Sequence, residues 1–159
     1  RFCQVTGVQT CALPISILIL GSFPSVKSRE QMFYYGHPRN RFWVVTAAVF
    51  GSPVPGSIDQ KKEFLHANHI ALWDSIASCD ITGSSDSSIK NVTANDISSL
   101  IAGTRISRIF CNGRTSYEVY RKYVKNSTLM DAVCLPSTSP ANASWSPEKL
   151  TAEWRIIRI

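Results

Sequence analysis

The chain has 159 residues, of which 44% are hydrophobic and 18% are charged, a composition typical of one folded domain that excludes a disordered chain. Its formal net charge of +6, with a pI near 9.2, favours a polyanionic partner. The longest apolar run near the start, Ile15 to Leu20, is interrupted by Ser16 and is far too short to span a bilayer.

The first sixteen residues, RFCQVTGVQTCALPIS, resemble the translation of a sequencing adapter more than a protein segment. They also lack the basic start and the long apolar stretch of a signal peptide. We therefore expect residues 1–16 to be a non-native segment, and residues 17–159 to form a single domain that has lost its native N-terminus.

Of the five cysteines, Cys3 and Cys11 fall in this first segment, and Cys79, Cys111 and Cys134 lie more than twenty residues apart. No C-x-x-C pair is present, so neither a zinc site nor an iron–sulfur cluster is expected. Cys111 and Cys134 fall in apolar runs, where a free cysteine behaves as a small buried hydrophobe. The pattern predicts a reduced, cytoplasmic protein without a metal or another cofactor.

Four short apolar runs predict buried strands, and helical patterns lie between them. The runs are ILIL from Ile17, IALW from Ile70, RIFC from Arg108 and AVCL from Ala132. Continuous hydrophobicity, without alternation, is what the strands of a parallel sheet show when both faces are covered.

Helices are predicted from Asn40, Ser57, Thr93, Arg114 and Ser146. Thr93 is interpreted as the N-cap of its helix, and Ser146 as an N-cap followed by a proline at the first helical position. The polar stretch SCDITGSSDSSIKN, residues 78–91, is predicted to be a long loop inside the domain.

The alternation of strands and helices predicts a three-layer α/β/α sandwich on a central, mainly parallel four-stranded sheet with right-handed crossovers. In such a fold the ligand site lies beyond the carboxyl ends of the strands. The sequences at those ends are GSFPS, WDS, CNGR and LPSTSPANAS, so we expect the functional residues among them.

The turn after the first strand, GSFPS, carries groups that can bind a phosphate or the polar edge of a base. Gly21 and Pro24 set a tight turn, and Ser22 and Ser25 offer hydroxyls and exposed N–H groups beside a helix start. For this motif alone, an ordinary strand-to-helix turn is the alternative. A G-x-G-x-x-G dinucleotide motif is absent.

The motif FYYGHPRN places aromatic rings on a loop rich in glycine and proline. We predict that Tyr35 stacks on a nucleobase, because a ring in such a loop can present a free face. Phe33 and Tyr34 are expected to cover the edge of the core instead, and Phe42 and Trp43 to lie in the core at helical spacing.

The late loop, LPSTSPANASW (residues 135–145), is stiff and rich in small residues. Small side chains let a DNA strand approach closely, and the hydroxyls of Ser137 and Ser139 can bind phosphates. A plain loop with ordinary turn chemistry is the alternative.

Together, LILGSFPSVKSREQMFYYGHPRNRFW and LPSTSPANA resemble the uracil-DNA glycosylase superfamily, in particular its hypoxanthine-DNA (deoxyinosine) glycosylase branch. The resemblance extends over essentially the whole chain from Ile17. It implies a monofunctional glycosylase of base-excision repair that flips out a deaminated base, hypoxanthine first, and hydrolyses its N-glycosidic bond with an activated water. Mismatch-specific removal of uracil and a catalytically inactive nucleic-acid-binding module of the same fold are the alternatives.

The resemblance gives Asn40 of HPRN the catalytic role, which is to orient a water toward the anomeric carbon. The mismatch-specific branch carries a water-positioning asparagine in its first turn, where this chain has Phe23. The late loop also departs from the L-P-N-P-S-G-L pattern, so Ala141 and Asn142 are the nearest candidates for the wedge that fills the gap left by a flipped base. The implied base-binding residues are Ser22, Phe23, Pro24, Tyr35, His37 and Asn112.

Two of these residues have structural alternatives. His37 can stabilise the departing base or satisfy backbone groups of its own loop. Asn112 can touch the base or cap the helix that follows it. Asp74, Asp86 and Ser87 are expected to border the same face of the molecule.

The expected contacts to the DNA strand combine small polar residues with basic ones. They are Ser25, Lys27, Arg39, Ser137, Ser139, Ala141 and Asn142, with Arg41, Arg114, Arg121 and Lys122 as further phosphate candidates.

The opening segment (residues 21–43) contains a single carboxylate, Glu30, so a strong general base is not expected there. This favours a dissociative path through a sugar cation, in which stabilisation of the departing base and positioning of the water set the rate. The expected partner is DNA that contains a deaminated base. We expect a monomer that binds no metal and no membrane.

Overall fold

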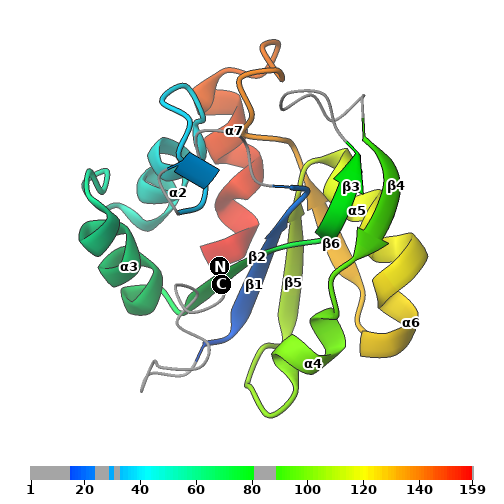
Figure 1. Cartoon of the computed structure of the whole chain (residues 1–159). Coiled ribbons are helices and arrows are strands. Elements are labelled where there is room, and N and C mark those ends of the chain that lie inside the picture. The colour runs from blue at the N-terminus through cyan, green and yellow to red at the C-terminus, as the bar shows by residue number, and fades with distance from the viewer. Residues whose placement is uncertain (1–14, 24–28, 31–32, 81–88, 159) are drawn as a thin grey trace.

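The computed structural model describes residues 15–23, 29–30, 33–80 and 89–158 (Figure 1). At its centre lies a parallel sheet of four strands in the order β2-β1-β5-β6. These strands begin where the apolar runs predicted them, so the predicted sheet is confirmed. They are β1 (Ile17–Gly21), β2 (Ile70–Asp74), β5 (Arg108–Asn112) and β6 (Ala132–Leu135).

One face of the sheet is covered by α2 (Phe42–Phe50), α3 (Ile58–Ala67) and α7 (Pro147–Trp154), as Figure 1 shows. Ile17 and Ile19 of β1 belong to the buried cluster on this side. Successive side chains of a strand point to opposite faces, so the residues between them serve the other face.

The other face carries α4 (Ile97–Ile101) and a longer helical segment of α5 (Arg114–Val119), a π-helical turn (Tyr120–Val124) and α6 (Lys125–Thr128). Leu18 of β1 belongs to the buried cluster on this side. Helices on both faces confirm the predicted three-layer sandwich. Within the described residues, no helix combines the length and hydrophobicity needed to cross a membrane.

The carboxyl ends of the four strands meet at one edge of the sheet, because the parallel register aligns them. Gly21 at the end of β1 pairs with Asp74 at the end of β2. Asn112 at the end of β5 pairs with Leu135 at the end of β6. The opening segment after β1 and the late loop after β6 therefore begin at the same edge of the sheet, with the end of β5 between them.

The stretch 78–91 is not a continuous loop. β3 (Ile76–Asp80) and β4 (Lys90–Ala94) pair as a second, antiparallel sheet of two strands, so the loop prediction was wrong at both ends of the stretch. Most of their side chains are exposed or half-buried, and register shifts interrupt the pairing. The hydrophobic alternation that marks a strand in a sequence is therefore weak.

The helix predicted from Thr93 begins later, because Thr93 lies in β4. Asp96 is the N-cap of α4, and its carboxylate accepts a hydrogen bond from the N–H of Ser99 at 3.1 Å. The cap predicted at Ser146 is confirmed, since its hydroxyl accepts from the N–H of Lys149 at 3.2 Å.

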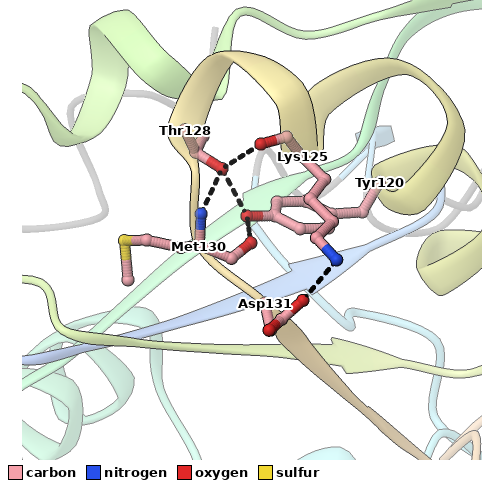
Figure 2. A network of polar contacts seen from close by, with 5 residues as sticks. All are labelled: Tyr120, Lys125, Thr128, Met130 and Asp131. Atoms are coloured by element: carbon pink, nitrogen blue, oxygen red, sulfur yellow. Dashed lines mark hydrogen bonds and ion pairs between the residues drawn. The ribbon is translucent and has the colours of Figure 1, made fainter.

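A buried tyrosine fixes the turn between α6 and β6 (Figure 2). The Tyr120 hydroxyl donates to the carbonyl of Met130 at 2.7 Å and lies 2.7 Å from the hydroxyl oxygen of Thr128. Beside it, the Lys125 ammonium pairs with the Asp131 carboxylate at 2.5 Å. This network places the start of β6, and with it the late loop.

Ile15 and Ser16 lie within the fold, at the end of the segment predicted to be non-native. The side chain of Ile15 is 5% exposed. The N–H of Ser16 donates to the carbonyl of His69 at 3.1 Å, and its carbonyl accepts from the N–H of Ser107 at 3.0 Å. The boundary at residue 16 and the extent of the domain stay predictions.

Replacing Tyr120 with phenylalanine is expected to lower the free energy of unfolding by about 1–2 kcal/mol, because the carbonyl of Met130 loses its hydroxyl donor. Urea unfolding followed by circular dichroism measures the change. Tyr123→Phe is the matched control, since that ring is 51% exposed. Equal stability of the two variants would contradict the role given to the network.

Candidate active site

Gly21 allows two side chains to approach the end of β1 closely. A Cβ atom at this position would lie 2.9 Å from Oδ1 of Asp74 and 3.1 Å from the hydroxyl oxygen of Tyr35. Both distances are shorter than ordinary carbon–oxygen contacts. The carboxyl edge of the sheet therefore holds a buried carboxylate and a phenol over one glycine.

The Tyr35 ring rests on a rigid aromatic support. It stacks on the ring of Phe42 with a centroid distance of 4.1 Å and an interplanar angle of 17°. Phe42 is fully buried and meets Trp154 edge to face at 5.8 Å. Because Phe42 covers one face of Tyr35, only the opposite face is left for a base, and the stacking role stays a prediction.

Burial raises the pKa of the Tyr35 hydroxyl well above its usual range. The Asn112 amide acts in the opposite direction, and the nearby charge of Asp74 raises the pKa further. The phenol is therefore neutral at physiological pH.

The Asn40 side chain is held in one orientation by its oxygen. Oδ1 accepts hydrogen bonds from the N–H of Phe42 and from the hydroxyl of Thr138, both at 2.9 Å. Among the described residues, Nδ2 has no hydrogen-bond partner. Asn40 thus satisfies an N–H at the start of α2 and keeps an amide donor for another ligand.

Asn112 fixes Thr138 through two hydrogen bonds. Nδ2 of Asn112 donates to the Thr138 hydroxyl at 2.9 Å, and the N–H of Thr138 donates to Oδ1 of Asn112 at 3.0 Å. Thr138 is fully buried and Asn112 is 8% exposed. The chain Asn112–Thr138–Asn40 therefore joins the end of β5, the late loop and the opening segment.

His37 satisfies backbone groups of its own loop, as its structural alternative predicted. Nδ1 accepts from the N–H of Arg39 at 3.1 Å, and the carbonyl of His37 accepts from the N–H of Asn40 at 2.9 Å. Because Nδ1 accepts, the proton of the neutral ring is on Nε2. The role of this Nε2–H as a donor to a leaving base stays a prediction.

The carbonyls of the opening turn bind the start of β3. The carbonyl of Gly21 accepts from the N–H of Ser75 at 2.7 Å, and that of Ser22 accepts from Ile76 at 3.1 Å. The ring of Phe23 has the guanidinium of Arg29 5.7 Å from its centroid. The predicted residues Pro24, Ser25, Lys27, Asp86 and Ser87 lie outside the described residues.

The late loop is folded by its own polar side chains. The Ser137 hydroxyl accepts from the N–H of Ser139 at 3.1 Å, and the Ser139 hydroxyl accepts from that of Ala141 at 3.2 Å. Nδ2 of Asn142 donates to the carbonyl of Ser137 at 2.9 Å. Asn142 is thereby turned into the loop, whereas Ala141 is exposed.

The side chain of Arg41 points into the late loop and is not directed at a position where it would bind a phosphate. Its guanidinium donates to the carbonyls of Ser139 at 2.7 Å and Asn142 at 3.0 Å, and also to that of Trp145. Nε contacts the carbonyl of Thr138 at 3.4 Å. This corrects the prediction, because all of its nitrogens are used within the protein.

The other predicted cations are on the surface. Arg39, Arg114 and Lys122 are exposed. Arg121 forms an ion pair with Glu118 at 2.7 Å, one helical turn away. Their contacts with phosphates stay predictions.

Thr138, which connects the two asparagines, is not among the residues predicted from the motifs. In the sequence it is one hydroxyl residue among several in the late loop, and no local signal separates it from Ser137 and Ser139. Its burial arises only when the loop folds against the opening segment.

In the described part of the chain, no group of three or more His, Cys, Asp and Glu residues could hold a metal ion. Cys111 and Cys134 are free thiols; Cys111 is buried as expected, whereas Cys134 is exposed.

Comparison with known proteins gives a consistent set of relatives. A family profile described as the uracil DNA glycosylase superfamily matches residues 8–158. The hypoxanthine DNA glycosylase of Methanosarcina acetivorans is 36% identical over 143 residues, which cover 89% of each chain. That of Methanosarcina barkeri is 34% identical over 104 residues, 64% of this chain and 66% of the relative.

A solved structure is also similar. The solution NMR structure of a candidate uracil DNA glycosylase from Methanosarcina acetivorans has a TM-score of 0.76 and 31% sequence identity. The match covers 94% of each chain.

Gly21→Ala is expected to lower the free energy of unfolding by about 1–3 kcal/mol, because the new methyl group overlaps Asp74 and Tyr35. Chemical denaturation measures the loss. The control is Gly56→Ala, where the nearest atom would be 3.5 Å away and the change should stay within about 0.5 kcal/mol. A Gly21 variant as stable as this control would show that Asp74 and Tyr35 can move away from the methyl group without loss of stability, which would contradict the prediction.

The raised pKa of Tyr35 predicts a loss of stability in alkali. Its folded-state pKa exceeds the ordinary 10.0, so the unfolded chain releases the proton first and stability falls as the pH rises above 10.0. The difference in unfolding free energy between the wild type and Tyr35→Phe should shrink by up to about 1.4 kcal/mol per pH unit there. Tyr120, Cys111 and Cys134, whose pKa values burial also raises, are present in both proteins, so their own titration contributes to both stability curves. A difference independent of pH would contradict the assignment.

Proposed function

Because this chain belongs to the uracil DNA glycosylase superfamily, we propose that it is a monofunctional DNA glycosylase of base-excision repair that removes hypoxanthine from deoxyinosine. The names of the two Methanosarcina relatives support hypoxanthine as the base. The net charge of +6 supports DNA as the partner. The free thiols of Cys111 and Cys134 support a reducing compartment such as the cytoplasm.

We base this function on one feature of the site, the fixed amide of Asn40. The N–H of Phe42 and the hydroxyl of Thr138 hold its oxygen, which directs Nδ2 as a donor. The ring of Phe42 also supports Tyr35. A donor for a water and a platform for a base are therefore anchored on the same residue.

The base has to leave the duplex before its glycosidic bond can be reached, which requires a few kcal/mol and less for a poorly paired base. In our proposal it stacks on the face of Tyr35 that Phe42 leaves uncovered, an interaction of roughly 1–3 kcal/mol. Phe23 contacts its side, and the backbone of Ser22 and Phe23 reads its edge.

The reaction is a hydrolysis that proceeds through a sugar cation. The bond between C1′ and the base nitrogen breaks, and its electron pair leaves with the base, which the Nε2–H of His37 stabilises by a hydrogen bond. A water held by Nδ2 of Asn40 then adds to C1′. The added water loses one proton to solvent and the departed base anion takes one up, so the products are an abasic site and the neutral free base. A strong carboxylate base is not required, since the cation accepts a neutral water.

The late loop supplies contacts to the strand around the flipped nucleotide. Ala141, which is exposed, fills the gap in the base stack, and Asn142 supports it from inside the loop. The hydroxyl hydrogens of Ser137 and Ser139 donate to phosphates, although their oxygens accept backbone N–H groups. Ser25, Lys27 and Arg39 contribute further phosphate contacts.

The wild-type protein is expected to excise hypoxanthine from duplexes that contain inosine. Labelled duplexes with inosine, uracil or thymine are incubated with the protein and then treated with hot alkali, which cleaves at abasic sites. Cleavage should occur at inosine and only after alkali, as for a monofunctional enzyme. Cleavage at uracil alone would replace hypoxanthine with uracil as the substrate, and binding without cleavage would indicate an inactive module.

Asn40→Ala and Asn40→Asp are expected to lower the single-turnover excision rate by roughly 100-fold or more, because both remove the Nδ2 donor. The aspartate keeps an oxygen for the N–H of Phe42 and the hydroxyl of Thr138, so its thermal stability should stay close to that of the wild type. Asn126→Ala, at an exposed position of α6, is the control. A fully active alanine variant would refute the role of Asn40.

A further inference from the structure

The Arg41 side chain lies where four backbone carbonyls of the late loop converge. Three of them, from Ser139, Asn142 and Trp145, accept from the terminal guanidinium nitrogens. The fourth, from Thr138, accepts from Nε at 3.4 Å and from the backbone N–H of Arg41 at 3.1 Å. These four residues span most of the loop.

Converging carbonyls need hydrogen-bond donors between them. Their dipoles point at one another and would repel in the half-buried interior of the loop, and an unsatisfied buried carbonyl is unfavourable. A guanidinium presents five N–H donors in a planar fork, whereas a lysine ammonium is a compact charge with three donors. The geometry therefore suits arginine and not merely a positive charge.

The same residue is rigidly connected to Asn40. Arg41 follows Asn40 in the chain and directly precedes α2, where its carbonyl accepts from the N–H of Val45 at 2.8 Å. Arg41 is also connected to Asn40 through Thr138. Arg41 binds the carbonyl of Thr138, and the Thr138 hydroxyl donates to Oδ1 of Asn40 at 2.9 Å. The late loop thus fixes the orientation of the amide together with the N–H of Phe42.

We propose that Arg41 is a positioning residue that holds the late loop in its active conformation and thereby orients the Asn40 amide. This inference rests on the proposed function for its effect on excision, and on the geometry alone for its effect on the loop. If Arg41 has this role, its guanidinium does not contact a DNA phosphate.

The test uses Arg41→Ala and Arg41→Lys in the full chain. Arg105→Ala is the control, because Arg105 is exposed and precedes the amino end of β5, at the opposite edge of the sheet. At saturating inosine duplex, the single-turnover rate should fall roughly 10- to 100-fold in Arg41→Ala. The salt dependence of the affinity for DNA should be unchanged. Loss of a phosphate contact would instead reduce the slope of log K against log salt by about 0.9.

Rescue and hydrogen exchange complete the test. Methylguanidinium at millimolar concentration should restore a large part of the rate in Arg41→Ala and none in Asn40→Ala. Amide exchange of Asn142 and Trp145, whose N–H groups are bonded within the loop, should accelerate in both Arg41 variants and not in the control. Should Arg41→Ala fail to fold, Arg41→Lys gives the same readouts apart from rescue.

The outcomes separate the two claims. If the wild type excises no base, the proposed function fails, and hydrogen exchange still decides whether Arg41 holds the loop. If the folded Arg41 variants keep the exchange protection of the loop and the wild-type rate, or if their salt slope falls, the positioning role is refuted.

Discussion

The site depends on the buried hydroxyl of Thr138, which joins two asparagine side chains from distant parts of the chain. It accepts from Asn112 at the end of β5 and donates to Asn40 at the start of α2. Each amide is thereby left with one orientation, because its oxygen has defined donors. A second set of hydrogen bonds between the late loop and the opening segment comes from the guanidinium and the backbone N–H of Arg41. The parallel register of the sheet makes the link possible by bringing the carboxyl ends of β5 and β6 together.

A second constraint is the lack of space above Gly21. The phenol of Tyr35 and the carboxylate of Asp74 occupy the volume that any side chain would take. Tyr35 has a positive φ of 52°, which is unfavourable for a tyrosine, and it stacks on the buried ring of Phe42. Packing therefore overcomes a local preference and holds the ring of a loop residue against the core.

The fold could be predicted to a large extent, and the site only in part. Ile17, Ile70 and Arg108 start strands where the apolar runs indicated, because strands covered on both faces are continuously hydrophobic. Ala132 also starts a strand as predicted, but β6 lies at the edge of the sheet and its Val133 and Cys134 are exposed. β3 and β4 were missed because their stability comes from pairing with each other and hardly from burial. Asn40 and Tyr35 were selected from loop chemistry and family resemblance, and their proposed roles still await the experiments above. Arg41 was assigned to phosphates because an arginine in a polar loop is usually exposed.

The sequence by itself determined the order of the elements, the parallel sheet and the edge at which polar residues gather, since these follow from hydrophobic patterns and turn residues. Only the tertiary structure decided which polar groups at that edge are used within the protein and which remain for a ligand. Hydrogen bonds between residues about a hundred positions apart, such as those of Arg41 and Asn40 with the late loop, depend on distances that no local pattern encodes. For that reason the inward turn of Arg41 and Asn142 and the burial of Thr138 appear only in the folded chain.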